Sequence, residues 1–147
     1  LIELANVALA QKEFSKALGY VKTAYDLDIS NENAGFTYAA ALIYAGKNAE
    51  VDAFLTERFG TKFAAQPILI NAYAATKQYD RLIQIWKERI ESEPNNGQNY
   101  VSLAASYLAA GDRQNAISAL EKAIVINPQF KEQGAFYIKE IRAGRNP

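Results

Sequence analysis

Residues 97–130 read GQNYVSLAASYLAAGDRQNAISALEKAIVINPQF. From Asp112 onward the apolar residues recur at steps of three and four, which places them on one side of an α-helix. Asp112 is a good N-cap for this helix. The residue before a proline avoids the helical region, so the helix ends near Asn127. A second apolar face precedes Gly111, and the stretch therefore predicts a helical hairpin that turns at this glycine.

The turn of this hairpin recurs along the chain. Gly46-Lys47-Asn48 repeats the pattern of the turn at Gly111, and the links at Lys12 and Lys77 lie in the same phase. The four anchors Lys12, Gly46, Lys77 and Gly111 are separated by 34, 31 and 34 residues. A period of this length is typical of stacked helical hairpins, each of which buries its apolar face only against its neighbours.

The unit 97–130 resembles the tetratricopeptide repeat. The residues that carry the resemblance are Tyr100, Leu103-Ala104, Tyr107, Gly111, Ala116, Leu120, Ala123 and Pro128. The resemblance covers the whole chain and is looser before this unit. It implies an all-α fold, a right-handed α-solenoid of stacked antiparallel helix pairs, as a single domain over 1–147. The repeats are then about 1–31, 32–62, 63–96 and 97–130, followed by a capping helix at 131–143.

The expected helices of the four hairpins lie at about 1–11, 14–28, 32–45, 48–59, 64–76, 79–92, 97–110 and 113–126. Pro67 conflicts with the start of the fifth, because a proline inside a helix costs about 3 kcal/mol. It is tolerated in the first turn, so we expect this helix to start late, near Gln66. Trp86 occupies the large apolar core position of its repeat.

The capping helix is expected to pack on the last hairpin. Its apolar residues Ala135, Ile138 and Ile141 face the hairpin in this interpretation, whereas the charged residues between them face water. The segment Gly144–Pro147 reads as a loose tail.

Composition limits the classes of function. The chain holds 16 Lys plus Arg and 16 Asp plus Glu, so its formal net charge is zero. Nucleic-acid binders usually carry a basic excess, and we expect no nucleic-acid partner. The chain contains no Cys and no His, which removes thiolate chemistry, the commonest general base and the commonest metal ligands. We therefore expect no enzyme, no catalytic residue, no metal and no cofactor.

The chain starts at Leu1 and contains no Met, so we interpret it as a piece of a larger protein. No apolar run approaches the roughly 20 residues that span a bilayer, and we expect no direct membrane insertion of this piece. The absence of cysteine does not indicate a compartment. A soluble domain of a larger, membrane-anchored bacterial protein is one interpretation.

The resemblance implies a concave groove lined by the first helix of each hairpin. The candidate partner-binding residues are Asn6, Asn33, Phe36, Thr37, Tyr44, Ile68, Asn71, Gln98, Val101 and Ser102. This set carries no net charge, and its amides can pair with the backbone of an extended peptide. Two alternatives remain open: Phe36 and Ile68 pack between helices instead, and Asn6 and Asn71 are simply solvated. A tetratricopeptide subclass binds C-terminal carboxylates through Lys and Arg, which the groove positions lack here.

The leading function is therefore a protein-interaction module that binds a peptide or a partner protein in a neutral groove. One alternative is an accessory domain of a bacterial membrane enzyme, such as an O-antigen ligase or polymerase-like protein, because Leu120–Ile124 and Ile138–Gly144 look similar to the C-terminal ends of such proteins. Another is a scaffold that associates with its own copies as a homo-oligomer. A fourth is RNA binding, which the neutral charge disfavours.

Overall fold

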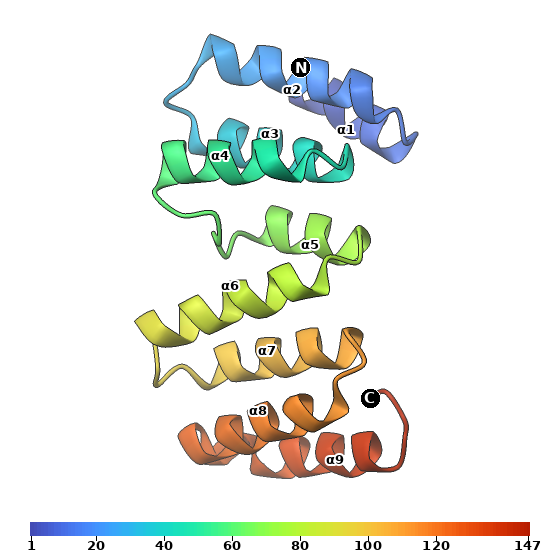
Figure 1. Cartoon of the computed structure of the whole chain (residues 1–147), viewed down its shortest axis with the longest axis vertical. Coiled ribbons are helices and arrows are strands. Elements are labelled where there is room, and N and C mark those ends of the chain that lie inside the picture. Colours follow the sequence, from blue (N-terminus) through green and yellow to red (C-terminus); the bar gives the residue numbers. More distant parts are fainter. The chain divides into compact units, whose positions relative to one another are not determined.

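The structure, a computed structural model, describes all residues 1–147 and is built from helices alone (Figure 1). The chain forms two compact units, Leu1–Lys77 and Gln78–Pro147, and each is described by itself. The helices of the first unit are α1 (Ile2–Ala10), α2 (Phe14–Leu27), α3 (Glu32–Tyr44), α4 (Asn48–Phe59) and α5 (Pro67–Ala75). The second unit holds α6 (Tyr79–Ser92), α7 (Gly97–Ala109), α8 (Arg113–Ile126), the 3₁₀ turn η1 (Pro128–Phe130) and α9 (Lys131–Arg142).

The helix bounds follow the sequence closely, and the proline prediction is confirmed. Gln66 is the N-cap of α5 and Pro67 its first helical residue. Proline is favoured there because the missing N–H would have had no partner inside the helix. The border between the two units falls inside the predicted third repeat, 63–96, after α5 and before α6.

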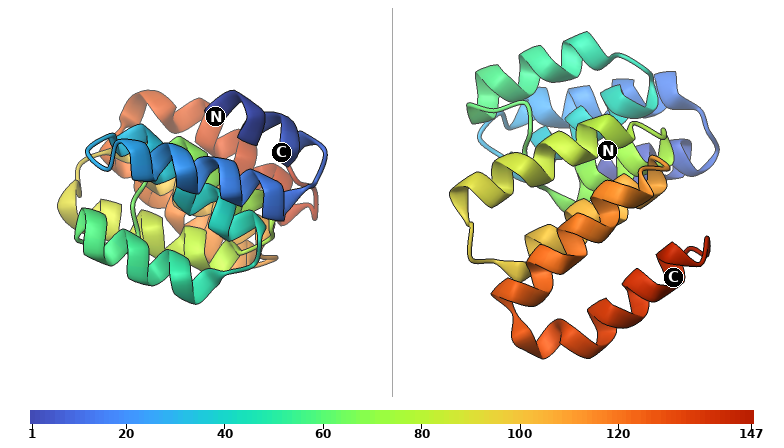
Figure 2. Two further views of the ribbon diagram at one scale, coloured as in Figure 1. Left: turned by 90° about the horizontal axis from the view of Figure 1, so that it is seen from above. Right: turned by 60° about the horizontal axis from the view of Figure 1, so that its bottom comes forward.

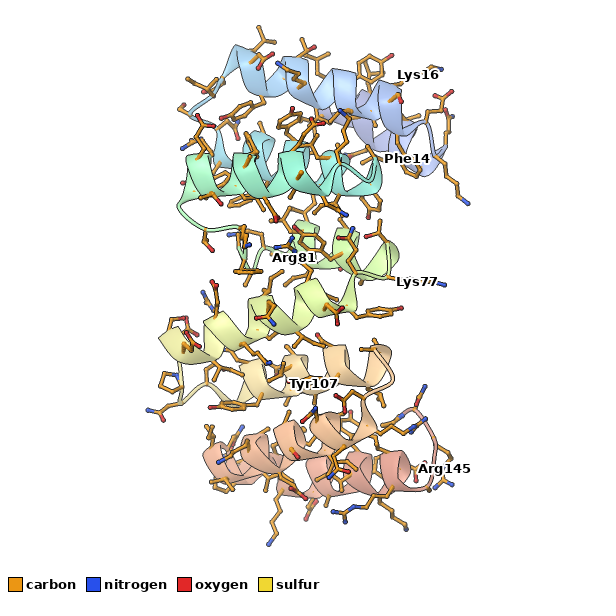
Figure 3. The ribbon with its side chains drawn as sticks, viewed as in Figure 1. Phe14, Lys16, Lys77, Arg81, Tyr107 and Arg145 are labelled. Atoms are coloured by element: carbon orange, nitrogen blue, oxygen red, sulfur yellow. The ribbon has the colours of Figure 1, made fainter.

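The first helix of each pair ends in the same backbone reversal. Left-handed φ angles occur at the four predicted links, 59° at Lys12, 73° at Gly46, 57° at Lys77 and 84° at Gly111. After Gly46, the amide of Lys47 donates to the carbonyl of Leu42 at 2.9 Å, and equivalent bonds follow Lys12 and Gly111. This is the Schellman pattern, which supplies partners to the last carbonyls of a helix. The repeat register of the sequence therefore corresponds to a recurring piece of backbone geometry, and Lys77 lies at one of these links (Figure 3).

A fifth reversal of the same kind ends α9. Gly144 has a φ of 81°, and the amide of Arg145 donates to the carbonyl of Glu140 at 2.9 Å. Gly144 lies 33 residues after Gly111. The predicted capping helix therefore ends with the same Schellman geometry as the first helix of a repeat.

The core of the first unit is centred on α3. This helix packs against α1, α2, α4 and α5, and nine of its residues are buried. Ala39, Ala40 and Ala41 are small enough to let these neighbours approach closely. An aromatic cluster closes one side, where Phe54 of α4 meets the rings of Tyr25 and Tyr38 edge-on.

The core of the second unit lies around α7 and α8, with α6 against α7 and α9 against α8 (Figure 2). Leu103, Ala104 and Leu120 are buried there. Trp86 of α6 packs on this cluster, so the prediction that it is a core residue is confirmed. The prediction for α9 is confirmed at Ile138 and Ile141, which are buried.

The same prediction is wrong at Ala135, which is exposed. Its neighbour Gly134 is buried instead. A Cβ at Gly134 would lie 2.8 Å from Ile124 and 2.9 Å from Phe130, so only a glycine lets α9 approach α8 this closely. None of the nine α-helices combines the length and the apolar composition that crossing a bilayer requires.

Candidate partner-binding surface

The predicted groove residues on α1, α3 and α5 do not share one environment. Three amides, Asn6, Asn33 and Asn71, are exposed, as is Ile68. Tyr44 is half-buried, and its ring stacks on Phe14 with centroids 6.1 Å apart. These residues remain accessible to a partner to differing degrees.

Two predicted groove residues of α3 are buried. Phe36 is 9% exposed and stacks on Phe59 of α4, with ring centroids 4.1 Å apart. Thr37 is also buried, and its hydroxyl donates to the carbonyl of Asn33 at 2.7 Å. The burial favours the alternative in which Phe36 packs between helices, and it leaves neither side chain facing a partner.

The three predicted residues on α7 belong to the second unit. Gln98 is exposed and Val101 is half-buried, and both line a cleft of about 680 Å³. Ser102 is half-buried and does not line it; its carbonyl accepts the hydroxyl of Ser106 at 2.9 Å.

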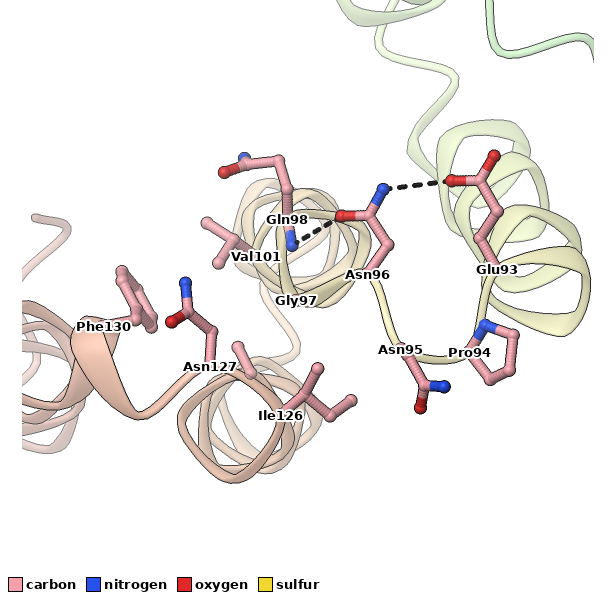
Figure 4. Close-up of a pocket in the computed structure, with 11 residues that line it drawn as sticks. Glu93, Pro94, Asn95, Asn96, Gly97, Gln98, Val101, Ile126, Asn127 and Phe130 are labelled. Carbon is pink, nitrogen blue, oxygen red and sulfur yellow. Dashed lines mark hydrogen bonds between the residues drawn. The ribbon is translucent and has the colours of Figure 1, made fainter.

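The cleft is formed where α7 begins and α8 ends (Figure 4). Its wall on one side is the link from α6 to α7, and on the other side it reaches the turn η1. The lining residues are Glu93, Pro94, Asn95, Asn96, Gly97, Gln98, Val101, Ala123, Ile126, Asn127 and Phe130.

The polar side of the cleft is held by helix caps. Asn96 is the N-cap of α7, and its side-chain oxygen accepts the amide of Gln98 at 3.1 Å. The side-chain amide of Asn96 donates to Glu93 at 3.0 Å, and this hydrogen bond lowers the pKa of the Glu93 carboxyl. Glu93 also pairs with Arg89 at 2.8 Å. The ionisable side chain of the cleft is therefore paired, and the cleft offers amides rather than net charge.

The apolar side of the cleft is formed by residues of α7, α8 and η1. Val101 projects from α7, Ile126 ends α8, and Phe130 ends η1 (Figure 4). Gly97 brings the backbones of α7 and α8 together, because a Cβ there would lie 3.2 Å from the Cβ of Asn127.

Val101 also lines a second hollow of about 170 Å³ farther along α7. The other lining residues are Ala104, Ala105, Leu108, Leu120, Tyr137, Ile141 and Pro147. The cleft and this hollow therefore lie in sequence along one side of α7 with Val101 between them. We call them together the α7 groove.

The C-terminal tail is attached at the far end of this groove, and the prediction of a loose tail is wrong. Arg113 of α8 donates to the carbonyls of Ile141, Gly144 and Arg145 at 3.2, 3.0 and 3.0 Å. It also donates to the side chain of Asn146 at 2.9 Å. Pro147, which follows, lines the hollow.

Sequence reasoning did not find Arg113, Phe130 or Tyr137 as parts of this surface. Their contribution depends on contacts between separate elements, which the repeat pattern does not specify. One signal was present, since Gly144 follows Gly111 at nearly the repeat spacing and marks where α9 ends. Clusters of three or more acidic, His or Cys side chains able to hold a metal ion do not occur in the structure.

Comparison with known proteins supports the architecture. No protein-family model and no curated protein matches the chain. It is similar to the solved structure of MamA 41-end from Desulfovibrio magneticus RS-1, with 14% identity and a TM-score of 0.51, covering 99% of this chain and 94% of that one. It is also similar to the MamA RS-1 ArsTM double mutant, with 16% identity and a TM-score of 0.50, covering 86% of this chain and 72% of that one. MamA contains tetratricopeptide repeats, and the predicted all-α, tetratricopeptide-like helical-repeat fold is confirmed.

Proposed function

We propose that this chain is a protein-interaction module that holds an extended peptide segment of a partner protein along the α7 groove. The observation that carries the proposal is the continuity of the cleft and the hollow through Val101. A continuous groove suits an extended segment, because successive side chains of the segment meet successive parts of the wall.

The chemistry of the wall supports a neutral ligand. Asn95 and Gln98 are exposed at the cleft and make no side-chain hydrogen bond within the chain, so their amides can donate to and accept from a peptide backbone. Glu93 is already paired with Arg89 and does not add an unpaired charge. A partner segment with apolar side chains meets Ile126 and Phe130 in the cleft.

The tail of the chain supports the choice of an extended segment. Pro147 lies against the hollow while Arg113 holds the backbone that precedes it. The same wall thus already contacts a short non-helical stretch with an apolar ring. The exposed residues Asn6, Asn33, Ile68 and Asn71 of the first unit remain additional candidates for partner contact.

The proposal is tested with a random peptide library displayed on phage and selected on the 147-residue chain. Recovered peptides are then measured by calorimetry against Val101→Asp, which puts a carboxylate beside the apolar wall. We expect the affinity to fall by about tenfold or more. Val125→Asp is the matched control, because Val125 is strongly exposed on α8 and lies outside the groove.

Circular dichroism verifies that both variants keep their helix content. Peptides that bind Val101→Asp as tightly as the original chain contradict the proposal. Resonance shifts of Gln98 and Val101 on titration with a selected peptide give an independent location of the site.

The other interpretations of the sequence remain predictions. A scaffold of associated copies predicts a sedimentation coefficient that rises with concentration, and an RNA-binding module predicts salt-dependent retention of RNA. No contact within either unit favours an accessory role in a membrane enzyme over these.

A further inference from the structure

The hollow beside α7 is enclosed by apolar side chains from α7, α8, α9 and the C-terminal tail. Its volume is about 170 Å³. Its floor is buried, because Ala104, Leu120 and Ile141 are each at most 3% exposed. Of the eight residues that line it, only Tyr137 carries a polar group on its side chain. The hollow therefore offers contact to an apolar group and no charge to an ionic one.

The polar group of Tyr137 already has a partner. The side-chain amide of Gln133, one turn earlier on α9, donates to the Tyr137 hydroxyl at 2.7 Å. Gln133 is exposed, so this hydrogen bond draws the hydroxyl toward a residue on the surface. The aromatic ring is then the part of Tyr137 that is left to contact a group in the hollow.

Aromatic rings connect the hollow to the cleft. Phe130 lines the cleft and Tyr137 lines the hollow, and the centroids of their rings lie 6.2 Å apart with the planes tilted by 56°. Val101 of α7 lines both spaces. The two parts of the α7 groove are therefore joined twice, through Val101 and through this pair of rings.

The tail forms the last wall of the hollow. Arg113 holds its backbone by donating to the carbonyls of Gly144 and Arg145, both at 3.0 Å. Arg145, labelled in Figure 3, in turn donates to Glu140 at 2.7 Å. Pro147 lines the hollow but stays exposed, and the space of about 170 Å³ is left unfilled. The tail therefore borders the hollow without occupying it.

The size of the hollow matches one six-membered aromatic ring. An apolar cavity of about 150 Å³ inside a protein binds benzene. A charged or amide side chain would give up hydrogen bonds with water there without gaining a partner. An aromatic ring gains both the burial of its apolar surface and a stacked or edge-on contact with the ring of Tyr137.

We infer that the hollow is a binding pocket for one phenyl ring, supplied by a phenylalanine side chain of the segment that the α7 groove holds. The inference rests on the proposed function for the segment itself. The amides of the cleft pair with the backbone of the segment, whereas the hollow accepts one of its side chains. The hollow thereby determines which partner segments bind.

The pocket is tested first without a peptide, with toluene as the probe. Toluene carries the phenyl ring and the attached carbon of the proposed side chain. The methyl resonances of Ala104, Leu108 and Ile141 are followed by NMR as toluene is added to the 147-residue chain. We expect saturable shifts at these methyl groups, because a bound aromatic ring shifts the resonances of the groups around it. Unchanged resonances, or shifts of equal size throughout both cores, overturn the inference.

Ala105→Phe fills the hollow from its own wall. Ala105 is exposed on α7 and lines the hollow, so the larger side chain is introduced without repacking a core. We expect the affinity for toluene to fall by about tenfold or more. Ala53→Phe is the matched control, because Ala53 is an exposed alanine of α4 that does not line the hollow. Circular dichroism verifies the helix content of both variants, and equal toluene affinities in the two overturn the inference.

Peptides selected on the chain then test the identity of the side chain. We expect them to contain phenylalanine. Its replacement by alanine in the peptide should weaken binding by about tenfold or more, through the loss of apolar burial. Replacement by leucine should weaken it by about threefold or more, because the contact with Tyr137 is lost.

The outcomes separate this inference from the proposed function. Selected peptides that bind the groove without an aromatic residue, or equally well with leucine, overturn the assignment to a phenyl ring and leave the groove proposal intact. Toluene binding at the hollow without recovery of any peptide supports the pocket and contradicts the proposed function.

Discussion

The ring of Phe36 lies on the ring of Phe59, with centroids 4.1 Å apart and planes 14° from parallel. The stack joins α3 to α4, and Gly35 lies close to the ring of Phe59 as well. A Cβ at Gly35 would lie 2.9 Å from the ring of Phe59. Phe36 is therefore part of the core of the first unit, although its place in the repeat is that of a groove residue.

Phe36→Ala should lower the free energy of unfolding by about 3–5 kcal/mol, because it removes a buried ring and leaves a cavity beside Phe59. Urea denaturation monitored by circular dichroism measures the change. Ile68→Ala is the control, since Ile68 is an exposed residue of the same predicted set, and we expect it to cost less than about 1 kcal/mol. Equal effects of the two substitutions would contradict the assignment of Phe36 to the core.

The links at Lys12 and Lys77 use left-handed backbone with a side chain present. A Cβ in this region costs roughly 1–2 kcal/mol, which glycine avoids. Lys12→Gly and Lys77→Gly should each raise the stability by about 0.5–1 kcal/mol, after the larger entropy of glycine in the unfolded chain is subtracted.

The reverse change at an equivalent link is the matched control. Gly46→Ala should lower stability by about 0.5–1 kcal/mol, because Gly46 adopts the same left-handed conformation, open space around it leaves no packing effect, and the lower entropy of alanine in the unfolded chain offsets part of the strain. Thermal melting of the three variants under one set of conditions should show a higher melting temperature for the two Lys→Gly variants and a lower one for Gly46→Ala. Stabilisation by Gly46→Ala would show that the links do not share this geometry in solution.

Arg113→Gln should release the tail. Three backbone carbonyls and the side chain of Asn146 lose their donor, so the amides that follow α9 should exchange hydrogen faster with solvent. Hydrogen exchange read by mass spectrometry on the C-terminal peptide measures this. Arg142→Gln serves for comparison, because Arg142 makes one exposed ion pair, with Glu121 at 3.3 Å.

Unchanged protection in Arg113→Gln would mean that the tail is held by Pro147 and the Glu140–Arg145 pair instead. The second of these contacts is a two-point interaction, with Arg145 Nη2 donating to Glu140 Oε1 at 2.7 Å.

Asp112 links the stability of α8 to pH. Its side chain accepts the backbone amide of Asn115 at 3.1 Å and the side-chain amide of the same residue at 2.6 Å. The side-chain hydrogen bond with Asn115, followed by the backbone one, lowers the pKa of Asp112 below its unfolded value. A group with a lowered folded pKa contributes stability above the unfolded pKa and loses it as the pH falls through the folded value.

Asp112→Ala should therefore destabilise the chain near neutral pH, and the difference from the original chain should shrink as the pH falls below the ordinary range of aspartate. Asp112→Asn keeps a cap acceptor that does not titrate, so its effect should depend much less on pH. Thermal melts across the acidic range make the comparison. A constant difference between Asp112→Ala and the original chain would exclude this linkage.

Local signals in the sequence were sufficient to predict where the helices begin and end. Gly111 and Pro128 mark the ends of elements through backbone restrictions that act on the residue itself, and Pro67 predicts the late start of α5 for the same reason. The repeat spacing then aligned four links, including two lysines that no single-residue rule selects.

The environment of each side chain was less predictable, because it depends on residues far along the chain. Phe36 occupies a groove position by period, but the ring of Phe59 covers it. The tail lacks apolar periodicity, and the guanidinium that holds it lies on α8. Val101 was identified, whereas the parts of its surroundings supplied by η1 and α9 were not.

The chain has one tryptophan, so its fluorescence reports on the unfolding of one unit alone. Trp86 packs in the core of Gln78–Pro147, and the aromatic cluster of the other unit consists of Tyr and Phe alone. Emission excited at the red edge of indole absorption therefore follows one half of the molecule, while far-ultraviolet ellipticity follows both. If the two units unfold together, the fluorescence and ellipticity melting curves coincide. If the curves separate, the two units unfold independently.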